Sequence, residues 1–503
     1  MTSSAPTSPV TAVSDVIFLD GTFPGSRDLL GGKAYSVNKM QAMGLPVPPA
    51  FALPTHVCAI YHDNGRALPE PIWQDVLEQL HRLEADTGRT FGAEPSPLLV
   101  SVRSGAAQSM PGMMDTVLNL GLTPQLCRVL ADETGDQQWA DDTWQRFRHS
   151  YASIVAGDPT AEPPADPFEQ LRAAIGAVFD SWTNDRVKAY RARHNLGNGA
   201  GTAVTVQAMV FGNRDEHSGT GVMFSRNPAT GENTLYGEWL SRAQGEDVVS
   251  GEKTPSPLPT VSEILPEIYP QLEQVATILE HEHRDLVDIE FTVESGRLYV
   301  LQCRAGKRSP RAAVRIAVDL VREGVIEPKE ALARISPEQA AALADNHGVH
   351  EHHLVLASGI GAGPGAAVGH AVTDVDEART LAEAGTPVVL VRPSTAPDDV
   401  PAMFESVAVV TELGGSTSHA ALVCREIGLP CVVGAGAGTM TALAGRVVTV
   451  DGASGTVYDG DALNTDHSGA RDEHLDELLS YLPGPVPAEH PLAPLTNTDQ
   501  ERA

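Results

Sequence analysis

The 503-residue sequence predicts a multidomain protein of mixed α/β and α+β fold. A chain of this length holds roughly two to four domains, each large enough to bury its own core. Residues 16–310 alternate helix-like and strand-like segments joined by Gly-rich loops, and residues 351–462 repeat a compact strand–helix pattern. Such alternation is typical of sheets covered by helices.

Three other segments differ from these two in composition. Residues 1–15 are rich in Ser, Thr and Pro, which predicts a disordered N-terminus. Residues 311–350 are rich in Ala, Glu and Arg with apolar side chains at helical spacing, so we expect a helical connector there. Residues 463–503 form an expected mobile tail with one short helix over residues 472–482.

The net charge and the cysteine spacing limit the binding partners and the cellular compartment that we expect for this chain. The chain carries 35 basic and 65 acidic residues, a formal net charge of −30. This charge argues against nucleic acid or an anionic membrane surface as a general partner, although a local cluster of Arg and Lys can still bind an anionic substrate. No stretch is typical of a membrane span or a signal peptide, and five cysteines lack metal or disulfide spacing. We therefore expect a cytoplasmic protein with reduced thiols.

The segment Gly414 to Ala421, GGSTSHAA, places a histidine at the start of a helix. Residues 407–411 and 431–434 are apolar enough for buried strands, and residues 420–427 between them have a helical pattern that Gly428 ends. One of the hydroxyl residues 416–418 can cap that helix. The pattern therefore puts His419 in the first helical turn.

A histidine in that position is suited to carry a phosphoryl group. The group would meet free backbone N–H donors and the positive end of the helix dipole. Gly414 and Gly415 let the backbone approach closely, and a neutral imidazole is a nucleophile near pH 7. The alternative is a His419 that only caps or packs, because short motifs also occur by chance.

Two cationic side chains stand in segments that suit phosphate binding. Lys33 follows Gly31-Gly32, before a helix that ends at Gly44. Arg103 lies where a short strand meets a loop, and an Arg fork there could bind phosphate oxygens bidentately. The alternatives are an ordinary turn at Lys33 and a solvated surface arginine at position 103.

A strand pair near residue 290 carries polar residues at alternate positions. Asp288 and Glu290 share one face of the first strand, and Gln302 and Arg304 share one face of the second. A three-residue turn over 295–297 would pair the two sets on a common face, whereas a two- or four-residue turn would separate them. Converging carboxylates are ligands that Mg²⁺ takes beside nucleotide phosphates. The alternative is an amphipathic hairpin with a solvated polar face.

A third block, residues 212–251, combines small residues with a strand pattern. Its small residues could cover phosphates, and Glu238 and Gln244 would lie near them if the chain folds back. An ordinary hairpin is the alternative.

Together these segments resemble the pyruvate, phosphate dikinase family. The matching pieces follow the family's order over about residues 16–460. They are Gly31-Gly32-Lys33, SVRSGAAQSMPGMMDTVLN at 101–119, SGTGVMFSRNP at 218–228, AQGEDVVSG at 243–251, DIEF with LQCR, Leu390-Val391-Arg392, and GGSTSHAALVCREIGLPCVVG at 414–434.

The resemblance implies an ATP-grasp-like nucleotide-binding domain at 16–310 and a swivelling phosphohistidine domain at 351–462. In the family, ATP transfers its β,γ-diphosphate to the histidine, and inorganic phosphate then removes one phosphoryl group as pyrophosphate. By motif, His419 is the expected carrier, and Lys33 and Arg103 are expected to contact ATP phosphates. The residues expected to form the nucleotide and Mg²⁺ site are Asp288, Glu290 and Gln302, supported by Arg304.

The same resemblance bears on the destination of the phosphoryl group. Only a short tail follows Gly455, so the family's C-terminal PEP/pyruvate barrel has no counterpart, and residues 157–166 are shorter than the family's pattern. We therefore expect transfer to a separate PEP/pyruvate-domain protein or to another small-molecule acceptor. Thr417 is an expected regulatory site, because a phosphate there would crowd the His419 ring with negative charge.

Two other functions fit this architecture. One is an antibiotic-type phosphotransferase, although the connector leaves no room for a drug-binding domain. The other is a non-catalytic nucleotide-sensing phosphocarrier, against which the intact set of charged residues argues.

Overall fold

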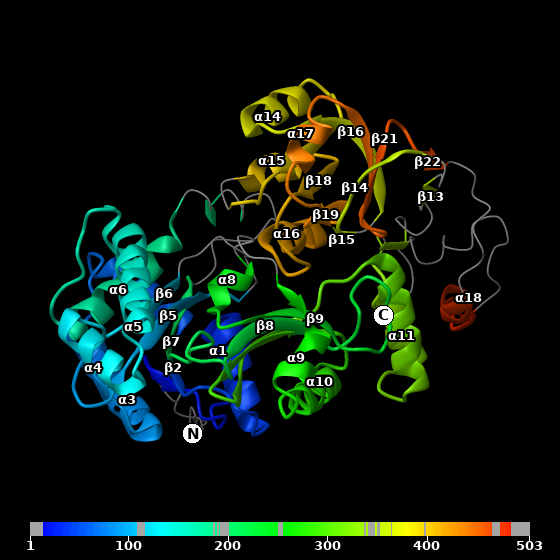
Figure 1. Ribbon diagram of the computed structural model, residues 1–503. Helices are drawn as coiled ribbons and strands as arrows, with labels where there is room; N and C mark the ends of the chain where they lie inside the picture. The colour runs from blue at the N-terminus through cyan, green and yellow to red at the C-terminus, as the bar shows by residue number, and fades with distance from the viewer. Residues whose placement is uncertain are drawn as a thin grey trace, which may run out of the picture. The chain divides into compact units, whose positions relative to one another are not determined.

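The computed structural model describes residues 14–107, 116–184, 187–188, 191, 201–249, 255–336, 339–340, 348–349, 353–363, 365–396, 399–464 and 473–483. It divides into two compact units, Met1–Met209 and Val210–Ala503. Both combine helices with mixed or antiparallel sheets, which confirms the predicted α/β and α+β multidomain class (Figure 1). The predicted disordered N-terminus, up to residue 13, and much of the predicted tail lie outside the described residues.

The first unit is built on a five-stranded sheet of order β1-β2-β7-β5-β6. Its strands are β1 (Ile17–Phe18), β2 (Ala50–Leu53), β5 (Val100–Gly105), β6 (Thr116–Leu120) and β7 (Ala203–Ala208), with a small pair β3 (Thr90–Phe91) and β4 (Pro97–Leu98). Its helices are α1 (Arg27–Ala42), α2 (Thr55–Asp63), α3 (Glu70–Thr87), α4 (Pro124–Thr134), α5 (Gln137–Ser150) with a π-helical extension (Tyr151–Ala156), and α6 (Pro167–Ser181).

The second unit begins with an antiparallel sheet of order β10-β9-β8-β11-β12. The strands are β8 (Gly219–Phe224), β9 (Tyr236–Ser241), β10 (Ser256–Pro257), β11 (Val287–Glu294) and β12 (Arg297–Ala305). The neighbouring helices are α8 (Gly245–Val249), a 3₁₀ turn (Leu258–Thr260), α9 (Val261–Ile264) and α10 (Tyr269–His283).

An eight-stranded sheet of order β14-β21-β20-β16-β17-β18-β19-β15 follows in the same unit. Strands β16 to β19 run parallel, and valines from β17 to β20 together with Ala371 of β16 contribute to its core. The strands are β14 (Val355–Ser358), β15 (Ile360–Gly361), β16 (Ala366–Val372), β17 (Val388–Arg392), β18 (Ala408–Thr411), β19 (Cys431–Val433), β20 (Val447–Asp451) and β21 (Thr456–Asp459), with a separate pair β13 (Gly348–Val349) and β22 (Leu463–Asn464). The helices are α14 (Val375–Glu383), α15 (Val400–Glu405), α16 (His419–Ile427) and α17 (Thr439–Leu443).

Helices α11 (Pro310–Arg322) and α12 (Pro328–Ala333) occupy the predicted connector, and α18 (Glu473–Ser480) is the short helix predicted near the end. The apolar face of α11 packs into one buried cluster with Leu478 and Leu479 of α18. None of the helices in the described part of the chain is long and apolar enough to span a membrane.

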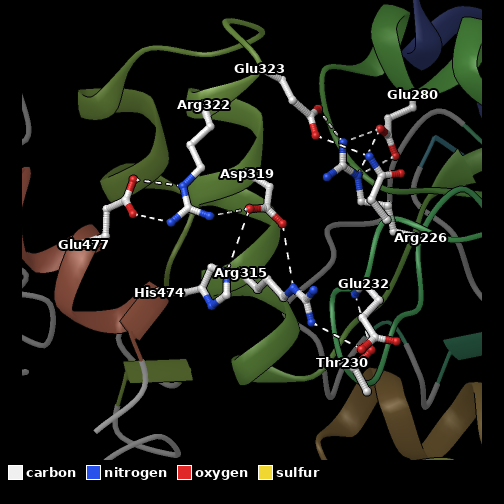
Figure 2. A network of polar contacts seen from close by, with 11 residues as sticks. Arg226, Thr230, Glu232, Glu280, Arg315, Asp319, Arg322, Glu323, His474 and Glu477 are labelled. Atoms are coloured by element: carbon white, nitrogen blue, oxygen red, sulfur yellow. Dashed lines mark hydrogen bonds and ion pairs between the residues drawn. The ribbon is translucent and has the colours of Figure 1, made fainter.

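Ion pairs hold α11 on two sides (Figure 2). On one side the buried Arg226, at the end of β8, donates from Nη2 to Glu280 of α10 at 2.7 Å and to Glu323 at 2.6 Å. On the other side, Arg322 donates from Nε to Glu477 of α18 at 3.2 Å, at a more exposed position. The buried fork is the one that ties α11 to the sheet β8–β12, because ion pairs exposed to water contribute little.

Candidate functional site

One face of the antiparallel sheet gathers the predicted carboxylates. Residues directly opposite each other in paired strands point to the same face of a sheet. Asp288 pairs with Arg304 on one side and Phe224 on the other, and Glu290 pairs with Gln302 and Val222. Strand β9 continues these two rows: Tyr236 pairs with Phe224, and Glu238 pairs with Val222. We call this surface the carboxylate face; it comprises Tyr236, Glu238, Val222, Phe224, Asp288, Glu290, Gln302 and Arg304.

The pairing across the hairpin is the one expected for a three-residue turn, but the turn itself has two residues. They are Ser295 (φ 49°) and Gly296 (φ 78°), and Glu294 pairs with Arg297. Positive φ at both central positions is typical of a type I′ turn. A β-bulge then shifts the register between Glu290 and Phe291 and leaves Leu301 as the extra residue. The bulge reverses the side-chain alternation, and so a two-residue turn still leaves the polar sets on one face.

The carboxylate face holds oxygen atoms that lack protein partners. Arg304 Nε donates to Asp288 Oδ2 at 2.8 Å. Asp288 Oδ1 and Gln302 Oε1 are buried and accept no hydrogen bond among the described residues. Burial raises the pKa of Asp288, although the Arg304 guanidinium opposes this rise and the charge of Glu290 adds to it. A bound cation would remove the cost of this buried charge.

These oxygens fit Mg²⁺ bound together with substrate phosphates. The described residues contain no cluster of three or more His, Cys, Asp or Glu side chains able to hold a metal without help. Mg²⁺ is commonly bound by one or two carboxylates while phosphate and water oxygens complete its shell. Asp288, Glu290 and the Gln302 amide oxygen match that incomplete set.

His419 is the first residue of α16, which begins after β18 as predicted and ends at Gly428 (φ 72°). Its Nδ1 lies 3.3 Å from Thr395 Oγ1. Its Nε2 is buried and has no hydrogen-bond partner among the described residues. When Nδ1–H donates to Thr395, the lone pair is left on Nε2, where it is available as a nucleophile.

Burial also keeps this imidazole neutral. The pKa of His419 is lowered by desolvation, with the Asp399 carboxylate acting in the opposite direction. A neutral ring at pH 7 retains the Nε2 lone pair. Ser418 holds the N-cap position by its backbone conformation, but its side chain makes no capping hydrogen bond.

The histidine loop is bound by a carboxylate that motif spacing alone did not place there. Glu238 of β9 accepts hydrogen bonds from Ser416 N at 2.7 Å, Thr417 N at 3.2 Å and Thr417 Oγ1 at 3.1 Å. The chain does fold back at β8 and β9, and it brings Glu238 onto the carboxylate face. The expectation that these loop N–H groups are free for a phosphoryl group is therefore wrong for Ser416 and Thr417.

The paired glycines permit this contact. A Cβ on Gly415 would lie 2.1 Å from Glu238 Oε2, and Gly414 has φ of 100°. A larger residue at 415 would displace the carboxylate. A second long-range contact comes from α16, where Arg425 Nη2 donates to the Ser416 carbonyl oxygen.

Lys33 and Arg103 belong to the first compact unit, and the other predicted site residues belong to the second. The Gly-Gly pair interrupts α1 rather than preceding it, because Gly31 has φ of 70° within the helix. Gly32 N donates to Ala106 O at 2.8 Å, and a Cβ on Gly31 would lie 1.8 Å from Gly105 O. The interruption thus packs Lys33 beside the end of β5, the strand that carries Arg103.

The segment Met110–Asp115, noted in the sequence beside Arg103, lies outside the described residues. Within the described chain, Arg103 pairs with Thr116 of β6 and Thr205 of β7.

Two family models match the chain. Residues 65–265 match the pyruvate phosphate dikinase AMP/ATP-binding domain, and residues 385–455 match the mobile domain of PEP-utilising enzymes. The second match includes the whole histidine loop and α16.

Curated relatives extend the similarity over most of the chain. The chain is 42% identical to a pyruvate, phosphate dikinase of Rhizobium meliloti, covering 86% of the chain and 56% of the relative. It is 43% identical to the chloroplastic pyruvate, phosphate dikinase 1 of Arabidopsis thaliana (82% and 47%) and 39% identical to the enzyme of Clostridium symbiosum (86% and 56%). The chain thus spans about half the length of these relatives.

Proposed function

We propose that this chain transfers a phosphoryl group from ATP to its own His419, because it is similar to pyruvate, phosphate dikinases and matches their AMP/ATP-binding domain and the mobile domain of PEP-utilising enzymes. One observation carries this proposal. The loop that presents the unpartnered Nε2 of His419 is hydrogen-bonded to Glu238, which shares the carboxylate face with Asp288, Glu290 and Gln302.

In the proposed first step, the Nε2 lone pair attacks the β-phosphorus of ATP. The Nε2–P bond forms, the bond between the β-phosphorus and the α,β-bridging oxygen breaks, and AMP leaves with that oxygen. In the tautomer that this step uses, the proton stays on Nδ1 and is donated to Thr395 Oγ1, so no base has to take a proton from the nucleophile. Little covalent chemistry is required of the protein, and catalysis depends on positioning and charge.

In the second step, inorganic phosphate attacks the γ-phosphorus of the diphosphohistidine. The bond between the γ-phosphorus and the β,γ-bridging oxygen breaks, and that oxygen stays on the β-phosphorus. Pyrophosphate leaves, and the β-phosphoryl group stays on Nε2. Lys33 and Arg103 would contact ATP phosphates, and Arg304 would orient Asp288. Mg²⁺, held by Asp288, Glu290 and Gln302, would supply the positive charge that the polyphosphate needs.

The phosphoryl group then passes from His419 to an acceptor. Pyruvate bound by a PEP/pyruvate module is the acceptor that the relatives' names favour, and another small molecule is the alternative. Incubating the phosphorylated protein with pyruvate, with and without such a module, and assaying PEP by mass spectrometry separates the two.

Labelled ATP tests the first two steps. With β-labelled ATP, acid-labile label should appear on His419 and remain after phosphate is added. With γ-labelled ATP, the label should leave as pyrophosphate when phosphate is added. The His419→Asn variant is the control and should stay unlabelled. A wild-type protein that never acquires acid-labile label would refute the proposal.

A further inference from the structure

Arg425 is a charged residue of α16 that none of the steps above uses. Its guanidinium lies 5.5 Å from the ring centroid of Phe224, in the middle of the carboxylate face. On that face Phe224 pairs with Tyr236 on one side and with Asp288 on the other. The arginine therefore lies over the row of residues that leads to the expected Mg²⁺ ligands.

The same guanidinium binds the histidine loop. Arg425 Nη2 donates to the carbonyl oxygen of Ser416, while Glu238 accepts from the N–H groups of Ser416 and Thr417. Residue 416 is thus held through its carbonyl by a cation from α16 and through its N–H by an anion from β9. His419 follows three residues later, and the orientation of its ring depends on this short stretch of backbone.

Packing alone does not explain an arginine at this position. The Nη1 atom is buried and has no hydrogen-bond partner among the described residues. Leaving such a donor unpaired costs stability, and an apolar residue would cover Phe224 without that cost. Burial lowers the pKa of Arg425, whereas the nearby acidic groups of Tyr236, Asp288 and Glu238 act in the opposite direction. A partly buried cation beside the carboxylate face, with one buried and unpaired N–H group, points to a functional role.

We propose that Arg425 is a positioning residue for the phosphorylation of His419: it fixes the Ser416 peptide on the carboxylate face and thereby aims Nε2 at the phosphorus. This inference rests on the proposed function. In this role Arg425 acts through the loop backbone, by its hydrogen bond to the Ser416 carbonyl oxygen, and takes no part in the bond changes at phosphorus. Arg425 fixes the Ser416 carbonyl only while Glu238 holds the Ser416 N–H group. We call these two contacts on Ser416 the clamp.

The test compares Arg425→Met with Arg425→Lys and with Arg446→Met. Arg446 is an exposed arginine of the same sheet region that pairs with Asp459 at 3.2 Å, far from the loop in sequence, and it serves as the matched control. Single-turnover labelling of His419 from ATP should be about 100-fold slower in Arg425→Met, because a misplacement of about 1 Å has that effect on a reaction. Arg425→Lys should recover part of the loss, and Arg446→Met should label at the wild-type rate.

Chemical labelling of His419 distinguishes a positioning role of Arg425 from general damage to the structure around the ring. Phosphoramidate phosphorylates histidines without an enzyme. It should label the buried Nε2 of His419 in Arg425→Met at least as fast as in the wild type, because a loosened loop does not bury the ring further. The KM for ATP should stay within about twofold, so that the loss appears in kcat. Normal ATP labelling of Arg425→Met, or an equal loss with phosphoramidate, would overturn the inference.

Amide hydrogen exchange of the loop tests the contact of Arg425 without requiring any phosphoryl transfer. The Ser416 and Thr417 amides should exchange at least about tenfold faster in Arg425→Met, and unchanged exchange would also overturn the inference. If wild-type protein fails to label from ATP while these amides respond to Arg425→Met, the proposed function fails and the clamp stands. Glu238→Gln combined with Arg425→Met should slow labelling little more than either change alone, because the two contacts act on one residue.

Discussion

The carboxylate of Glu238 receives hydrogen bonds from the backbone N–H groups of Ser416 and Thr417, 178 and 179 residues further along the chain. This contact joins the loop of the expected phosphocarrier to the sheet face that carries the expected Mg²⁺ ligands. In the sequence, these loop N–H groups suggested a binding site for an anionic phosphoryl group. In the structure, they bind the carboxylate of Glu238 instead.

Replacing this carboxylate should weaken the docking of the loop. In Glu238→Gln the amide oxygen can still accept one hydrogen bond, but the charge and the second acceptor are lost. Net contributions of hydrogen bonds to charged groups are about 1.5–3 kcal/mol, so labelling of His419 should slow by at least about tenfold. Rapid-quench labelling measures this rate. Glu232→Gln, which alters an exposed pair with Arg315, should have no effect.

A methyl group on Gly415 should have a related effect for a steric reason. The added Cβ would lie 2.1 Å from Glu238 Oε2, so the carboxylate has to leave the loop. Gly415→Ala should therefore slow labelling at least as much as Glu238→Gln does. In a Glu238→Ala background the space is open, and Gly415→Ala should then have little further effect. A full additional loss in that background would show that Gly415 acts through something other than Glu238.

The charge of Asp288 should lower the stability of the fold at pH 7 while supporting Mg²⁺-dependent labelling. Its folded pKa is raised above the ordinary 3.8, so the stability it contributes is present at acidic pH and is lost as the pH rises through the folded pKa. At pH 7, Asp288→Asn removes a buried charge and should unfold at the same temperature or a higher one. Its Mg²⁺-dependent labelling should nonetheless fall by at least about 100-fold. Thermal melting and labelling of one preparation check the stability and the activity. A marked drop in the melting temperature would contradict the expected direction of the stability change.

The activity of His419 should persist to unusually low pH. Its folded pKa is lowered from 6.5, so its stability contribution is present above pH 6.5 and is lost as the pH falls through the folded pKa. Labelling should stay constant below pH 6.5 until the ring protonates, provided that ATP and Mg²⁺ are saturating. His419→Gln should remove this part of the pH dependence of unfolding. A labelling rate that halves at pH 6.5 would show an ordinary, unshifted histidine.

The two ion pairs on α11 should differ in strength. Arg226 is 1% exposed and bridges Glu280 and Glu323, so Arg226→Met leaves the 14% exposed Glu280 without its cation, while Glu323 keeps the hydrogen bond from Asn233. Breaking a buried pair in this way costs about 3–5 kcal/mol. Arg322→Gln, at the more exposed pair with Glu477, should cost about 0.2–1 kcal/mol. Denaturant midpoints measure both, and equal effects would mean that burial does not decide the strength of these pairs.

The sequence by itself determined the local elements and which side chains they carry. Glycine, proline and hydroxyl signals placed His419 at the start of α16, because helix boundaries depend on residues a few positions apart. Strand alternation likewise put Asp288 with Glu290, and Gln302 with Arg304, on common faces. Ordered motifs over most of the chain then indicated the similarity to pyruvate, phosphate dikinases.

Only the tertiary structure decided how these pieces meet. The turn at Ser295-Gly296 alone would have separated the polar sets, and the bulge at Leu301 reverses its effect because it adds one residue to one strand. Glu238 and Arg425 reach Ser416 from a distant strand and from the far end of α16. No local pattern predicts such contacts, since they depend on register and on which surfaces pack together, and these are set by the whole unit.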